Sequence, residues 1–300
     1  MLDRILVPLD GTDFAERALT VAVSLARRSG GSLALATVEV PPPIEFPDVN
    51  MVEPLADVAH QYLESVAEQI REAGAADVSV AVLSGDPPEA LERHREAVEA
   101  GMTVMTTHGR SPLDRAWMGS VADTFVRSTG APVLFLRPAE EEGETDLDEM
   151  PGFGHIAVTL DGSELSETAV DPALVLADLF ESDVTLVRVV EYPHATESVY
   201  IPDAVKAIQE QHEDRREAAH AELEKIAARL SGEGRRVRRE TDVVNHSAMG
   251  ILQVVGEIGA DLVVMASHGR GGLSRVLLGS VADKVLRASK KPVMIVPAER

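Results

Sequence analysis

The chain has 300 residues, no cysteine and a formal net charge of −22, with 45% hydrophobic and 3% aromatic residues. This composition excludes disulfides and thiolate metal sites, and the negative charge argues against nucleic acid and anionic membranes as partners. No apolar run reaches the about 18–20 residues of a membrane helix and the start does not resemble a signal peptide, so we expect a cytoplasmic protein.

The basic residues are unusually poor in lysine. Only five of the 28 are lysines, namely Lys206, Lys225, Lys284, Lys290 and Lys291. This balance resembles that of halophilic proteins, because molar salt shortens the Debye length to about 3 Å and screens the self-repulsion of an acidic surface. An ordinary acidic protein is the alternative.

Each half opens on an apolar run that ends in Asp-Gly, Ile5–Gly11 and Ile156–Gly162. The apolar spacing near 3.6 in Thr12–Ser29 and Ser163–Glu181 predicts a helix after each turn rather than a hairpin. Further strands are predicted, in chain order, at Leu33–Val40, Val78–Leu83, Met102–Thr107, Pro132–Leu136, Val184–Val190, Val237–Val244, Leu262–Ser267 and Pro292–Val296. Further helices are predicted at Pro88–Ala100, at Ser247–Ile258, before each third strand and after each Gly-Ser pair.

Five strands alternating with four helices in each half predict two α/β domains. Each domain is expected to be Rossmann-like, an open five-stranded parallel sheet in the order 3-2-1-4-5 with helices on both faces. We place the domains at residues 1–138 and 153–300. The segment 139–152 between them is rich in acids and has no basic residue, which is typical of a solvated tether.

The most informative feature is a segment that occurs twice without a gap, Met105–Asp123 and Met265–Asp283. Both copies run from an apolar strand through a glycine-bearing loop into Gly-Ser and a helical pattern. This arrangement presents backbone N–H groups and the positive end of a helix to a phosphate. Because ligands bind outside the carboxyl ends of strands in open parallel sheets, we expect a nucleotide there, near Asp10 and Asp161.

These residues resemble the universal stress protein family, whose loop is Gly-x2-Gly-x9-Gly-Ser/Thr. The chain supplies Gly109-x9-Gly119-Ser120 and Gly269-x9-Gly279-Ser280, and the likeness extends over both halves. The resemblance implies a stress-response protein that binds ATP, ADP or AMP, with Mg²⁺ as a further candidate ligand. The nucleotide-binding residues that it implies are Asp10, Val38, Met105, Gly109, Gly119, Ser120 and Val121 in the first copy and Asp161, Val189, Met265, Gly269, Gly279, Ser280 and Val281 in the second.

Both copies depart from the family loop at its first glycine, which is Thr106 in one and Ala266 in the other. Threonine is bulkier than alanine, so we favour the second site over the first. A scaffold that binds no nucleotide is therefore an alternative, and a slow ATP hydrolase is another, although no catalytic base or metal ligand set can be assigned. His108 and His268 are interpreted as bracing the loop or contacting phosphate.

The last strand of each half is short, apolar and predicted to lie at a sheet edge. Exposed apolar edges invite pairing. The resemblance implies that such domains dimerise through this strand, so we predict an intramolecular pseudo-dimer of the two halves, with a homodimer as a further possibility.

Overall fold

The protein, as a computed structural model, is described over residues 1–39, 52–74, 77–107, 118–137, 147, 150–191, 202–231, 236–268 and 278–298. It divides into two compact units, Met1–Gly152 (unit 1) and Phe153–Arg300 (unit 2). Most of the predicted tether lies outside the described residues, so its boundaries stay a prediction.

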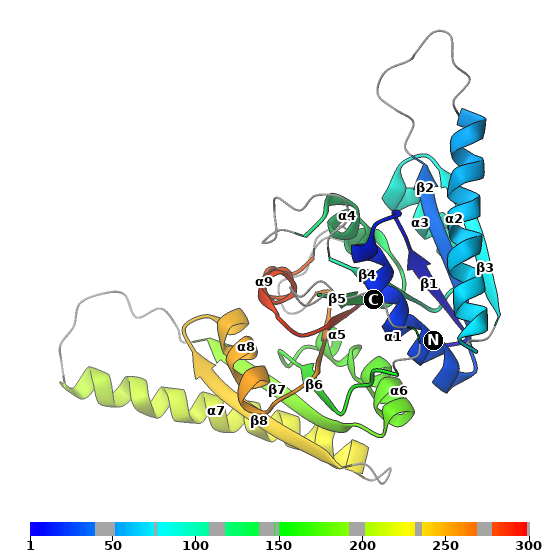
Figure 1. Cartoon of the computed structure of the whole chain (residues 1–300). Coiled ribbons are helices and arrows are strands. Elements are labelled where there is room, and N and C mark those ends of the chain that lie inside the picture. Colours follow the sequence, from blue (N-terminus) through cyan, green and yellow to red (C-terminus); the bar gives the residue numbers. More distant parts are fainter. Residues whose placement is uncertain are drawn as a thin grey trace. The chain divides into compact units, whose positions relative to one another are not determined.

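Unit 1 alternates strands and helices from end to end (Figure 1). Its elements are β1 (Arg4–Pro8), α1 (Asp13–Ser29), β2 (Ser32–Glu39), α2 (Val52–Glu72), β3 (Val78–Ser84), α3 (Pro87–Ala97), β4 (Met102–Thr106), α4 (Ser120–Ser128) and β5 (Val133–Leu136). All strand pairs are parallel, in the order β3-β2-β1-β4-β5. The predicted sheet is confirmed.

Unit 2 repeats this order with one more helix. Its elements are β6 (His155–Thr159), α5 (Glu164–Glu167), α6 (Val170–Phe180), β7 (Asp183–Glu191), α7 (Pro202–Ser231), β8 (Val237–Val244), α8 (Ser247–Glu257), β9 (Leu262–Ala266), α9 (Ser280–Ala288) and β10 (Val293–Val296). The strands are again parallel, in the order β10-β9-β6-β7-β8. From α3 onward the elements of unit 1 recur 160 residues later in unit 2 with the same lengths.

The prediction of one unbroken helix over Ser163–Glu181 was wrong. The helix stops after Glu167 and resumes at Val170. Pro172 lies in the first turn of the second piece. A proline ring clashes with the carbonyl four residues earlier and offers no N–H, so α5 cannot run on into α6.

Helices cover both faces of each sheet. The connections through α1 and α2 step across the sheet in one direction, and those through α3 and α4 step back. Right-handed crossovers therefore place α1 and α2 on one face and α3 and α4, which pack on each other, on the opposite face. The same argument places α7 opposite α8 in unit 2.

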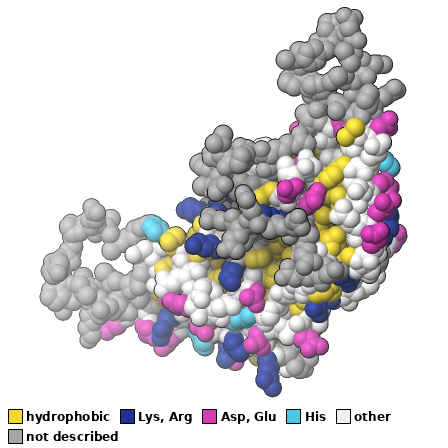
Figure 2. Space-filling model, in the orientation of Figure 1, with side chains coloured by type: hydrophobic (Ala, Val, Ile, Leu, Met, Phe, Trp, Pro, Cys, Tyr) yellow, Lys and Arg dark blue, Asp and Glu magenta, His cyan; other side chains and the backbone are white. Residues whose placement is uncertain are grey.

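The core is mainly aliphatic and the surface acidic, as the composition indicates. The largest fully buried side chains are Phe125 and Phe135, followed by aliphatic ones such as Ile5 and Leu35. Acidic side chains gather on the outer surface along α2 (Figure 2), where Glu68 and Glu72 are exposed. Among the helices of the described ranges, none is long and apolar enough to cross a membrane. Pairing between β5 and β10, the last strands of the two sheets, stays a prediction.

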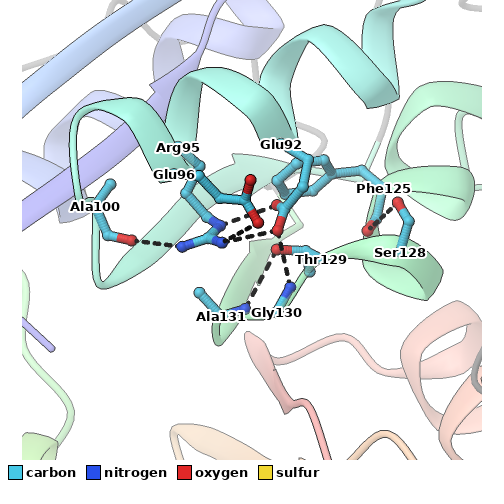
Figure 3. A network of polar contacts seen from close by, with 9 residues as sticks. All are labelled: Glu92, Arg95, Glu96, Ala100, Phe125, Ser128, Thr129, Gly130 and Ala131. Atoms are coloured by element: carbon cyan, nitrogen blue, oxygen red, sulfur yellow. Dashed lines mark hydrogen bonds and ion pairs between the residues drawn. The ribbon is translucent and has the colours of Figure 1, made fainter.

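A half-buried polar network joins α3 to the turn before β5 (Figure 3). Glu92 accepts two hydrogen bonds from the Arg95 guanidinium, at 2.9 and 2.8 Å, and one from the Gly130 N–H at 3.0 Å. Arg95 also donates to the Ala100 carbonyl at 3.1 Å. Burial by itself would raise the pKa of Glu92, but the hydrogen bonds from Arg95, Gly130 and Thr129 outweigh it and lower that pKa. The network fixes α4 against α3.

Candidate functional site

In unit 2 the predicted site residues come together on three adjacent strands. Thr159 of β6 is paired with Val187 of β7 on one side and with Met265 of β9 on the other. Asp161 and Val189 each lie two residues beyond the first of these pairs, at the carboxyl ends of their strands. The aspartate, the valine and the methionine therefore border one edge of the sheet.

Unit 1 has the same arrangement. Pro8 of β1 is paired with Ala36 of β2, so Asp10 and Val38 again lie two residues beyond a pair. Met105 lies in β4, which pairs with the other side of β1. The fold thus brings the predicted residues of each copy to the carboxyl edge, the position where parallel sheets bind ligands.

The two aspartates brace the turns that follow their strands. The Asp161 carboxylate accepts hydrogen bonds from the Ser163 N–H at 2.9 Å and from the Ser163 hydroxyl at 2.6 Å. Asp10 accepts the equivalent bonds from Thr12 at 3.1 and 2.6 Å. Ser163 and Thr12 in turn cap α5 and α1. Each half-buried carboxylate is therefore held in place at the strand end by the next helix.

Val189 is positioned by a glycine on α8. A Cβ atom added at Gly250 would lie 2.8 Å from Val189 and 2.8 Å from Val244, so no larger residue fits there without displacing them. The helix can therefore pack directly on the end of β7. The backbone of Val189, which the resemblance assigns to the adenine edge, is supported from below by this contact.

The methionines and the residues that replace the family's first glycine are buried. Met105 and Met265 expose 6% and 5% of their surface, and Thr106 and Ala266 expose 6% and 7%. These side chains are part of the packed ends of β4 and β9. The methionine side chains therefore belong to the core at the base of the site.

The last glycine of each loop, Gly119 or Gly279, forms a hydrogen bond with the residue that follows the preceding strand. The Gly279 N–H donates to the Ser267 carbonyl at 2.8 Å, and the Gly119 N–H donates to the Thr107 carbonyl at 2.7 Å. A Cβ atom at Gly279 would lie 3.1 Å from the same Ser267 oxygen, which is tighter than most contacts allow. The role of these N–H groups is therefore structural, and the loops begin and end beside the carboxyl ends of β4 and β9.

The helices that start at these glycines, α4 and α9, have no side-chain cap. Gly119 and Gly279 are the N-cap residues, and no side chain among the described residues accepts a hydrogen bond from the first turn. By contrast, Thr12 and Asp86 cap α1 and α3. The first turn of a helix has backbone N–H groups with no partner inside the helix.

The following residues suit an anion. Ser120 and Ser280 are exposed, and Val121 and Val281 are half-buried in the first turn of each helix. A serine hydroxyl and successive N–H groups at the positive end of a helix bind phosphate oxygens well. The predicted Gly109 and Gly269, together with His108, lie outside the described residues, so their roles stay predictions.

His268 stands at the entrance to the second loop. Its Nδ1 lies 3.0 Å from the Ser267 hydroxyl, which also accepts a hydrogen bond from the Ala298 N–H at 3.1 Å. Burial lowers the pKa of His268, so the ring is neutral at pH 7. Its Nε2 is buried, and no described residue supplies a partner. Sequence reasoning missed Ser267, although its place beside His268 in the repeat was the available signal.

Sequence reasoning also missed Arg188, a charged residue within the apolar run of β7. Its side chain is 7% exposed and forms an ion pair with Glu222 of α7. Its guanidinium lies against Gly162, where an added Cβ atom would be 2.2 Å from Nη1. A cation is therefore buried beside the turn that follows Asp161.

Unit 1 has neutral residues at the equivalent positions. Thr37, the residue before Val38, takes the place of Arg188, the residue before Val189. Tyr62 takes the place of Glu222, because each lies directly before a buried leucine of its helix, Leu63 in α2 and Leu223 in α7. The Tyr62 hydroxyl donates to Glu16 at 2.7 Å. Burial, with help from this bond, raises the pKa of Tyr62, so the phenol stays neutral.

Within the described ranges, no group of three or more His, Cys, Asp or Glu side chains could hold a metal ion. The described part of the candidate site offers backbone N–H groups, hydroxyls and one carboxylate per unit.

Comparison with known proteins supports the duplication directly. The model of the universal stress protein family matches residues 1–137 and 152–297. The chain belongs to the universal stress protein family. Universal stress protein Rv2005c of Mycobacterium tuberculosis is 31% identical over 274 residues, covering 87% of this chain and 83% of that protein. Rv1996 of the same organism is 26% identical over 326 residues, covering 97% and 94%.

The structural comparison shows the same tandem fold. A universal stress protein from Archaeoglobus fulgidus superposes over 100% of both chains with a TM-score of 0.74 and 18% identity. This universal stress protein thus shares its two-unit α/β architecture with a solved structure of full length.

Proposed function

We propose that each unit of this universal stress protein binds an adenine nucleotide, ATP or its ADP or AMP relatives, in a stress-response role. The observation that carries the proposal is the start of α4 and α9, which no side chain among the described residues caps, and which follows the strand paired with the one that leads to Asp10 or Asp161. A phosphate chain on this helix end would leave the adenosine next to Asp10 or Asp161 and the backbone of Val38 or Val189. The resemblance to the universal stress protein family implies these residues as nucleotide contacts, which motivates the choice of adenine.

The residues present fit such a ligand. Ser120 and Ser280 are exposed at the helix starts. The Gly119 and Gly279 N–H groups already donate to backbone carbonyls. The phosphate donors would therefore be the N–H groups and hydroxyls from residues 120–122 and 280–282. The negative charge comes from the phosphates of the ligand, and the protein supplies hydrogen-bond donors for them. The proposal assigns no catalytic base.

Calorimetry on the full chain tests the proposal. ATP, ADP and AMP are titrated separately in molar KCl with Mg²⁺, and far-UV circular dichroism verifies the fold. We expect saturable binding of at least one of the three. A folded protein that binds none of them would refute nucleotide binding. Mass spectrometry of ligand carried through purification gives the stoichiometry per chain.

A scaffold that acts through protein contacts and binds no nucleotide is the second candidate. The buried Thr106 and Ala266 side chains favour it, because they occupy positions that the family leaves open. An adenine nucleotide released on heat denaturation of purified protein would count against this scaffold. A slow ATP hydrolase is the third candidate, and it would need turnover that is lost in His268→Ala.

A further inference from the structure

Two side chains of α1 hold the end of unit 1. The Ser24 hydroxyl, which is fully buried, donates to the Pro151 carbonyl at 2.6 Å. One turn later, Nη1 of Arg27 donates to the thioether sulfur of Met150 at 3.3 Å. Residues three apart on a helix share one face, so the two contacts act together. We call Ser24, Arg27, Met150 and Pro151 the α1 anchor.

The hydrogen bonding of Arg27 is incomplete in this anchor. Its Nε and Nη2 atoms are buried, and no residue of the described ranges accepts a hydrogen bond from them. The acceptor at Nη1 is a thioether sulfur, which is a weak one. Buried donors without a partner cost free energy. The α1 anchor therefore has spare donors beside Met150 and would gain from a stronger acceptor at that position.

The sulfur of Met150 belongs to an accessible residue. Met150 exposes 37% of its surface, whereas the other described methionines of α4, β4 and the loop between them are buried, with 8% or less exposed. Peroxides convert an accessible methionine into methionine sulfoxide, which is polar. The oxygen of a sulfoxide is a much better hydrogen-bond acceptor than a thioether sulfur. Oxidation of Met150 would therefore supply the acceptor that Arg27 lacks.

We propose that Met150 is a site of oxidation by hydroperoxides, and that Arg27 binds the sulfoxide that forms. A lone pair of the sulfur attacks one oxygen of hydrogen peroxide and the O–O bond breaks. The second oxygen takes up the proton of the first and leaves as water, so the sulfur loses the two electrons that the peroxide gains. The flexible methionine side chain lets the new oxygen turn toward the free Arg27 donors. Oxidation thus tightens the α1 anchor.

The repeat shows that the anchor is not a requirement of the fold. Unit 2 has Val175 and Asp178 at the positions of Ser24 and Arg27, 151 residues later. A valine side chain and an ionised aspartate donate no hydrogen bond. The α1 anchor is therefore particular to unit 1, and it ends directly before Phe153, where unit 2 begins. Its strength determines how firmly the start of that connection is held on α1.

The experiment uses the full chain treated with hydrogen peroxide, and peptide mapping by mass spectrometry measures the sulfoxide at each methionine. Hydrogen exchange then measures the opening of the last two turns of α1, which carry Ser24 and Arg27. Met150→Leu removes the sulfur, Arg27→Leu removes the donors, and Met150→Gln supplies a permanent amide acceptor without peroxide. Met249→Leu is the matched control, because Met249 of α8 exposes 65% of its surface and is oxidised as well.

We expect Met150 and Met249 to be oxidised before the buried methionines, and exchange in the last two turns of α1 to slow by about tenfold on oxidation. The same slowing should occur in oxidised Met249→Leu and in untreated Met150→Gln. It should be absent in oxidised Met150→Leu and Arg27→Leu.

Unchanged or faster exchange in the oxidised wild type would overturn the inference, and so would a slowing that persists in Arg27→Leu. Met150 that stays unoxidised while Met249 reacts fully would overturn it as well. If Arg27→Leu loses its fold, as judged by far-UV circular dichroism, Met150→Gln decides, because it leaves Arg27 in place. The outcome does not depend on nucleotide binding.

Discussion

Two glycines with the same backbone conformation and different surroundings provide the sharpest test of the unit 2 turn. Gly11 and Gly162 have φ angles of +80° and +79°. Replacement by alanine puts a Cβ atom into the left-handed region, which costs about 1–2 kcal/mol at each site. At Gly11 the added Cβ atom meets nothing within 4 Å, so this backbone cost is the whole expected loss of stability.

At Gly162 the added Cβ atom would lie 2.2 Å from Nη1 and 2.6 Å from Cζ of Arg188. The guanidinium must therefore move away from the turn and weaken its ion pair with Glu222. Breaking a fully buried pair costs about 3–5 kcal/mol. Because Glu222 is half-exposed, we expect a smaller excess of about 1–3 kcal/mol over the Gly11 variant.

Hydrogen exchange with mass spectrometry on the full chain measures the opening free energy of peptides from α1 and from α5–α6 in each variant. We expect Gly162→Ala to destabilise α5–α6 by more than Gly11→Ala destabilises α1. In an Arg188→Ala background the excess should disappear, since the obstructing atoms are gone. Equal losses at the two glycines, or an excess that survives in that background, would refute the reasoning.

Three further predictions concern packing and charge. Glu92→Leu alone should destabilise unit 1 by about 1–3 kcal/mol because the half-buried Arg95 loses its main partner. Glu92→Leu with Arg95→Val, the residues found 160 positions later, should restore most of this loss in urea denaturation. Because the pKa of Glu92 is lowered on folding, its stabilisation is present above about pH 4.5 and is lost as pH falls through the folded pKa, so in an acid titration the double variant should lose less stability than wild type. Gly250→Ala should cost about 1–3 kcal/mol and weaken ATP binding in unit 2, as measured by calorimetry, because Val189 must shift.

Salt dependence tests the reading of the composition. A formal charge of −22 destabilises the compact state at low ionic strength. We expect the melting temperature to rise steeply between 0.1 and about 2 M KCl as the Debye length shortens. A flat response would favour an ordinary acidic protein over a halophilic one.

Most of the architecture follows from local patterns in the sequence. The Asp-Gly turns lead into helices because Thr12 and Ser163 supply caps, and the duplicated Met-to-Asp segment fixes two copies of one unit. The predicted strand order 3-2-1-4-5 is confirmed in each unit. The break between α5 and α6 depends on Pro172, whose position in the first turn the apolar spacing did not reveal.

The location of the candidate site could be predicted from the sequence, but the contacts between its residues could not. Strand register brings Asp161, Val189 and Met265 together, as the repeat and the switch-point rule indicate. The bond from the Gly279 N–H to Ser267 and the packing of Arg188 on Gly162 depend on atoms far apart in the sequence. The hydrophobic period and the spacing of motif residues do not reveal such contacts.

The most direct test of the central claim is amide hydrogen exchange of the full chain with and without saturating ATP. Binding at the helix starts predicts new protection at residues 120–122 and 280–282, with the Gly119 and Gly279 amides, already bonded to backbone carbonyls, little changed. Binding of ATP to the folded protein without protection at either helix start would contradict this account.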